Sequence, residues 1–118
     1  MSEHQEQVAL FQWAELQKCT MPELGLLFAI PNGGQRDAKT GAKMKREGVK
    51  RGVPDICLPV ARGGHNGLFI ELKFGKNKAT KEQREWSYKL VEQGYIVATC
   101  WGFEWAKDAI EEYLRMEN

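Results

Sequence analysis

Apolar residues recur at helical spacing near both ends of the chain. Ser2 and Gln5 form a capping box, in which the serine side chain caps the helix and the glutamine side chain reaches back to the cap. This box predicts a first helix from about Glu3 to Lys18. A final amphipathic helix is predicted from Phe103 to Met116.

A third helix is predicted in the second half of the chain, after another capping box at Thr80 and Gln83. This helix stops at Gly94, a residue type that often ends helices, and its inward face is expected to carry Trp86, Leu90 and Val91. The apolar run Tyr95–Trp101 that follows predicts a strand. Because strand–helix–strand passages are almost always right-handed crossovers, we expect the strands on either side of this helix to be parallel.

Three shorter apolar runs predict the remaining strands. Leu24–Ile30 ends at a cluster of turn-forming residues and is either a strand or a buried extended segment. Asp55–Val60 and Gly67–Lys73 are joined by a short connection that contains glycine, which predicts an antiparallel hairpin. The polar segment Gln35–Gly52 is expected to be a loop with one helical turn around Ala42 to Glu47.

Composition indicates one soluble domain. The chain has 118 residues, of which 42% are hydrophobic and 28% charged, as in ordinary globular proteins that fold around a single core. No apolar run approaches the ~20 residues of a membrane span, and the start MSEHQEQ lacks the basic and apolar regions of a signal peptide. We expect a cytoplasmic α/β domain over residues 1–118, with a mixed β-sheet flanked by helices.

Cysteine and histidine spacing does not suggest a zinc site. No CxxC, HxH or HxxxH pattern is present, so a catalytic centre built on histidine and metal is disfavoured. The cysteines are expected to be thiols in the core, where free cysteine is common: Cys19, Cys57 and Cys100.

Charge is distributed unevenly, although the net charge is only +1. The segment Arg36–Arg51 carries +5 and the segment Lys73–Arg84 carries +4, whereas Glu104–Asn118 carries −3. A charge run is usually a solvated loop, but these two basic segments flank Asp55 and Lys73. They are therefore candidates for contact with the phosphate backbone of nucleic acid.

Two acids and one lysine are predicted to border a single point on the hairpin. Glu71 and Lys73 lie two residues apart in one strand, so their side chains share a face, about 6.6 to 7 Å apart along the strand. Asp55 begins the partner strand, and pairing can bring its carboxylate beside Glu71. A chance pair of this kind is common on exposed strands, and Asp37-Ala38-Lys39 is such a pair, but it lies in a segment with no strand pattern.

This combination suits metal-assisted phosphodiester hydrolysis. Hard oxygen ligands hold Mg²⁺, and Asp55, Glu71 and the backbone carbonyl of Leu72 are suitable ones; Mn²⁺ is expected to substitute. Lys73 can orient or deprotonate the attacking water and offset charge on the transition state. Gln83 can be interpreted as an active-site residue or as a purely structural one, since the capping box alone explains a glutamine at that position.

Three motifs resemble those of the VRR-NUC family, a branch of the PD-(D/E)XK nucleases, and the resemblance covers about 30–113. They are Gly52-Val53-Pro54-Asp55, Phe69-Ile70-Glu71-Leu72-Lys73 and Thr80-Lys81-Glu82-Gln83. The resemblance implies a core of helix, three strands, helix and strand. It also implies that Asp55 and Glu71 bind metal, that Lys73 is catalytic and that Gln83 belongs to the active site. A glutamate of the first helix would lie beside the metal, either Glu3, which precedes Gln7, or Glu6.

Stand-alone members of this family occur in phages and prophages and resemble Holliday junction resolvases. The resemblance therefore implies a bacterial or phage-encoded homodimer that cuts four-way DNA junctions, since symmetric resolution needs two active centres. A nickase or flap endonuclease of a repair or restriction system, and a non-catalytic nucleic-acid-binding module, are the alternatives. The residues expected to contact DNA are Arg36, Lys50, Arg51, Lys76 and Lys78.

Overall fold

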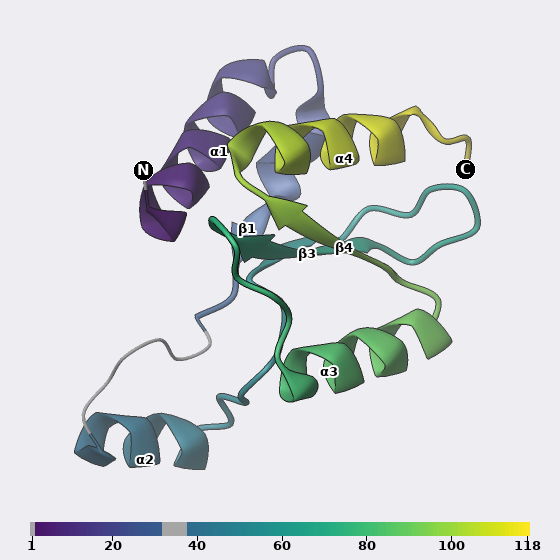
Figure 1. Cartoon of the computed structure of the whole chain (residues 1–118). Helices are drawn as coiled ribbons and strands as arrows, with labels where there is room; N and C mark the ends of the chain where they lie inside the picture. The colour runs from purple at the N-terminus through teal and green to yellow at the C-terminus, as the bar shows by residue number, and fades with distance from the viewer. Residues whose placement is uncertain (1, 32–37) are drawn as a thin grey trace.

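A four-stranded sheet carries helices on both of its faces in the computed structural model, which describes residues 2–31 and 38–118 (Figure 1). The elements in chain order are α1 (Glu3–Gln17), a 3₁₀ helix η1 (Pro22–Leu26), β1 (Phe28–Ala29), α2 (Ala38–Arg46), β2 (Ile56–Leu58), β3 (Leu68–Lys73), α3 (Lys81–Glu92), β4 (Ile96–Trp101) and α4 (Phe103–Arg115).

The sheet is mixed, with strand order β1-β2-β3-β4. β2 pairs antiparallel with both β1 and β3, which confirms the predicted hairpin. β3 and β4 are joined through α3 and pair in parallel, which confirms the predicted parallel pair. In Figure 1, α1 and α4 lie over one face of the sheet and α3 lies over the other. The α/β fold class predicted from the sequence is therefore correct.

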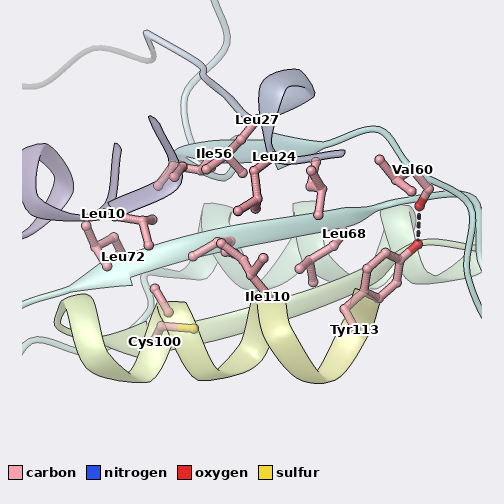
Figure 2. Packing of buried hydrophobic residues seen from close by; sticks show 14 residues of the cluster. Leu10, Leu24, Leu27, Ile56, Val60, Leu68, Leu72, Cys100, Ile110 and Tyr113 are labelled. Carbon is pink, nitrogen blue, oxygen red and sulfur yellow. Dashed lines mark hydrogen bonds between the residues drawn. The ribbon is translucent and has the colours of Figure 1, made fainter. Parts of the chain in front are cut away.

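The hydrophobic core lies between the sheet and the pair α1 and α4 (Figure 2). Alternate residues of β3 point into it and are fully buried: Leu68, Ile70 and Leu72. Leu10 of α1 and Ile110 of α4 pack against them, and the Tyr113 hydroxyl donates a hydrogen bond to the Val60 carbonyl. Because side chains alternate along a strand, the intervening residues of β3 point to the side of α3.

Both capping boxes form as predicted, at Ser2 with Gln5 and at Thr80 with Gln83. They fix the starts of α1 and α3, which begin one residue after their caps. Among the described residues, no helix is long and apolar enough to cross a membrane.

The segment before the basic loop differs from the prediction. Pro22 opens a 3₁₀ helix that takes up the first three residues of the apolar run, and the strand β1 that pairs with β2 contains Phe28 and Ala29. The basic segment differs too, because it holds the nine-residue helix α2 rather than a single turn.

Two of the residues expected in the interior are exposed. Val91 of α3 is 54% exposed, whereas Trp86 and Leu90 of that helix are half-buried. Cys19 is also exposed, because it lies in the turn that leaves α1, whereas Cys57 and Cys100 are buried in strands as expected.

Candidate active site

Asp55 and Glu71 lie opposite each other at one end of the hairpin. Ile56 pairs with Ile70, so the antiparallel register extended by one residue places Asp55 across from Glu71. The Asp55 N–H donates to the Ile70 carbonyl at 3.0 Å, and the Asp55 Oδ2 accepts from the Leu72 N–H at 2.8 Å. These bonds hold the aspartate backbone and side chain against β3, on the face away from the core.

Glu71 and Lys73 share that face and are buried there, with 3% and 7% of their surface exposed. The Lys73 Nζ lies 3.9 Å from the Glu71 Oε1. An acid and a lysine rarely reach this degree of burial unless they are paired. The burial distinguishes this pair from a solvated pair on an exposed strand.

Gln83 connects the lysine to the glutamate. Its Oε1 accepts from the Lys73 Nζ at 2.6 Å and from the Thr80 N–H at 2.8 Å, while its Nε2 donates to the Glu71 Oε1 at 3.0 Å. Gln83 therefore makes both the capping contact with Thr80 and contacts with Lys73 and Glu71. Because the capping bond from Thr80 holds the amide oxygen, the amide nitrogen is directed at Glu71.

The protonation of Glu71 reflects this crowding. Burial, followed by the charge of Asp55 and a hydrogen bond shared with it, raises the pKa of Glu71 from 4.5 to about 9, although Lys73 opposes the rise. The raised pKa means that Glu71 favours its protonated form at neutral pH in the absence of a cation.

Of the two N-terminal glutamates, Glu3 is the one coupled to the site. Burial raises the pKa of Glu3, the Asp55 carboxylate raises it further, and Lys73 lowers it. Glu6 lies toward the start of α4, where its Oε1 would be 3.1 Å from a Cβ built on Gly102. The first turn of α1 therefore places Glu3 in electrostatic contact with Asp55 and Glu6 beside Gly102.

The donor set fits a divalent cation that keeps much of its water. Within residues 2–31 and 38–118, no three His, Cys, Asp or Glu side chains converge to hold an ion by themselves. Mg²⁺ is commonly bound by one or two carboxylates together with waters, and Asp55 and Glu71 supply two. The N–H and C=O of one strand residue point the same way, so the Leu72 carbonyl lies on the side of Asp55. A cation there would relieve the repulsion that raises the Glu71 pKa.

Gly52 is a positioning residue whose role motif spacing alone did not reveal. Its φ is 92°, and a Cβ built on it would lie 2.8 Å from backbone and side-chain atoms of Glu82 in the first turn of α3. The chain that delivers Asp55 therefore packs directly on the helix that delivers Gln83. Positive φ and this close approach both require glycine.

Four of the five residues predicted to contact DNA are exposed in the segments that lead into and out of this centre. Lys50 and Arg51 are exposed and come immediately before Gly52. Lys76 and Lys78 are exposed in the loop that leaves the end of β3. Arg36 lies outside the described residues.

Comparisons with known proteins agree with this geometry. The model of the VRR-NUC domain family matches residues 1–104. A solved structure described as a VRR_NUC domain protein superposes with a TM-score of 0.85 and is 30% identical in sequence, and the match covers 100% of this chain and 92% of that one. A search of curated proteins found no match.

Proposed function

This chain belongs to the VRR-NUC domain family, and we propose that it is a Mg²⁺-dependent endonuclease that hydrolyses phosphodiester bonds in branched DNA. VRR-NUC is a nuclease-type domain, which supports the reaction class. The observation that carries the proposal is the cluster at the end of β3, where Gln83 hydrogen-bonds to the buried Lys73 and Glu71 and Asp55 lies across from Glu71.

In the proposed reaction, the carboxylates of Asp55 and Glu71 and the carbonyl of Leu72 bind the metal. The bound ion would polarise a phosphate oxygen and acidify a water. Glu3, which interacts electrostatically with Asp55, would add a further carboxylate near the metal.

We assign Lys73 two tasks, which are to orient the attacking water and to offset negative charge on the phosphoryl oxygens. Its ammonium group is held by Gln83 at 2.6 Å, so it does not need to be ordered when the substrate binds. A buried ammonium stabilises negative charge on the transition state more than an exposed one, because water screens it less. Removing it should therefore reduce the rate more than the affinity for DNA.

Branched DNA is proposed as the substrate because of the resemblance to junction resolvases, and a homodimer because symmetric cutting needs two centres. Lys50, Arg51, Lys76 and Lys78 would hold phosphates on either side of the scissile bond without reading sequence. We further propose a bacterial or phage origin and a cytoplasmic location. Mn²⁺ should replace Mg²⁺.

The test is cleavage of four-way junction, flap, duplex and single-stranded DNA with Mg²⁺, Mn²⁺ or EDTA. We expect paired nicks in the junction with either metal and none in EDTA. Cleavage by Asp55→Ala or Lys73→Ala at the wild-type rate, or cleavage in EDTA, would refute the metal mechanism. Preferential cutting of flaps would refute the junction assignment alone. Light scattering that shows only monomer, together with paired nicks, would refute the dimer.

A further inference from the structure

The helix α2 stands apart from the rest of the molecule (Figure 1). None of residues 39–46 is buried, and α2 makes no extensive packing contact with another described helix or strand. Most helices in proteins are stabilised by tertiary packing, and isolated helices shorter than about 12 to 15 residues are marginal in water. With nine residues, α2 falls below that length.

The end of α2 is nevertheless specified by its own sequence. Gly48 has φ of 97° and its N–H donates to the Lys45 carbonyl at 3.1 Å, while the Val49 N–H donates to the Met44 carbonyl at 3.0 Å. These two bonds with a glycine in the left-handed region form a Schellman motif. The chain therefore builds a helix with a defined end at a position where the domain gives it little to pack against.

The exposed face of α2 is cationic. Lys39, Lys43 and Arg46 are spaced four and three residues apart, so they share one face of the helix, and all three are exposed. Thr40 and Met44 share another face and are only partly exposed. The helix contains four cations, counting Lys45, and no acid. Such a face suits a partner with a regular array of negative charges.

We propose that α2 is an arm that lies along the phosphate backbone of duplex DNA beside the cleavage site, with Lys39, Lys43 and Arg46 as its contacts. The position of that site rests on the proposed nuclease function. Asp55 follows Arg46 by nine residues, which span at most about 30 to 32 Å at ~3.3 to 3.6 Å per residue. At ~3.4 Å per base pair, the helix reaches phosphates within about nine base pairs of the cut.

Binding of DNA should also stabilise the helix. Phosphates beside the cationic face would offset the repulsion among its lysines and arginine and supply a packing partner for a helix in which none of residues 39–46 is buried. Amide hydrogen exchange across residues 39–49 is therefore expected to slow when DNA is added. Unchanged exchange in this segment at saturating DNA would overturn the proposal.

The direct test is the triple variant Lys39→Gln/Lys43→Gln/Arg46→Gln, compared with Lys18→Gln/Lys107→Gln/Arg115→Gln. The control removes the same charge from α4 and the turn after α1, on the opposite side of the sheet. Fluorescence anisotropy in EDTA would give the dissociation constant of junction DNA across a salt series. We expect the arm variant to bind at least tenfold more weakly, with a salt slope reduced by about 2.7 for three lost phosphate contacts. The control should resemble wild type.

Two further measurements separate the arm from the catalytic centre. At saturating DNA, the arm variant should cleave within twofold of the wild-type rate, because no active-site residue is changed. On DNA whose duplex ends at the cut, so that no duplex remains beside it, the difference in affinity should disappear. Equal binding by the arm and control variants, or an unchanged defect on the shortened DNA, would overturn the arm. Salt-dependent binding through the arm without any cleavage would leave the arm standing and refute the nuclease.

Discussion

Replacing Gln83 should separate its capping role from its catalytic role, because the structure assigns both to one side chain. Gln83→Ala removes the acceptor for Lys73 and for the Thr80 N–H, together with the donor to Glu71. Thr80→Ala removes only the hydroxyl that accepts from the Gln83 N–H at 3.2 Å. The two variants thus share a damaged cap but differ at the active centre.

The expected magnitudes follow from the contacts. Loss of a Thr cap costs about 1 kcal/mol of stability, so Thr80→Ala should show a loss of this order and Gln83→Ala a larger one, because it also loses the bonds to Lys73 and Glu71. Hydrogen bonds to charged groups contribute about 1.5 to 3 kcal/mol, and Gln83 makes one to Lys73 at 2.6 Å and one to Glu71 at 3.0 Å. Since about 1.4 kcal/mol corresponds to a factor of ten in rate, losing one of them in the transition state should slow Gln83→Ala cleavage about 10- to 100-fold.

The assay is single-turnover cleavage of junction DNA with Mg²⁺, with urea denaturation of each variant alongside. Thr80→Ala is expected to cleave within about threefold of wild type, and Gln83→Ala is expected to be slow under conditions where urea denaturation shows that it is folded. Gln83→Glu is the matched control, because glutamate also completes a capping box but has no amide hydrogen to donate to Glu71. Equal rate losses in Thr80→Ala and Gln83→Ala, or a wild-type rate in Gln83→Glu, would refute the reasoning.

Two predictions concern stability. Gly52→Ala should destabilise the protein by about 2 kcal/mol or more, since its φ of 92° and the 2.8 Å approach to Glu82 both oppose a Cβ. Gly64→Ala is the control, because Gly64 has φ of 81° but open space around it, and it should cost about 1 kcal/mol. If urea denaturation gave the same loss of stability for Gly52→Ala and Gly64→Ala, the approach of Gly52 to Glu82 would not contribute to stability. In EDTA, native Glu71 keeps its proton up to about pH 9, whereas unfolded Glu71 ionises near pH 4.5, so the native state binds more protons in that window. The free energy of unfolding should therefore fall as pH rises from 5 to 8, by at most about 1.4 kcal/mol per pH unit. Glu71→Gln should remove this decline. If the free energy of unfolding changed with pH in the same way for wild type and Glu71→Gln, the raised pKa of Glu71 would be contradicted.

The parts of the fold that were predicted correctly are encoded locally. A capping box specifies its helix start within four residues, and the alternation along β3 separates the core residue Ile70 from Glu71 without reference to other elements. The PD and ExK motifs could be placed on one edge because a short hairpin limits how their strands pair. Local sequence patterns therefore suffice to bring Asp55, Glu71 and Lys73 together, and their roles in catalysis stay predictions.

The parts that were missed depend on packing between distant segments. The apolar run before the basic loop pairs over only two residues because Pro22 and tertiary contacts favour a 3₁₀ helix there. Val91 has the periodicity of an inward residue, yet α3 covers the sheet only partly and leaves it exposed. The approach of Gly52 to Glu82 joins residues 30 positions apart, so no local pattern encodes it.

Lys73→Met tests the central claim most directly, because methionine keeps most of the buried volume of the lysine and removes only its charge and donors. The measurement is the single-turnover cleavage rate of saturating junction DNA with Mg²⁺, for wild type and variant, with the affinity for DNA measured in EDTA. We predict an unchanged affinity and a rate reduced by at least 100-fold, which corresponds to about 2.7 kcal/mol. Cleavage by Lys73→Met at the wild-type rate would contradict the assignment of this buried cluster as the cleavage centre.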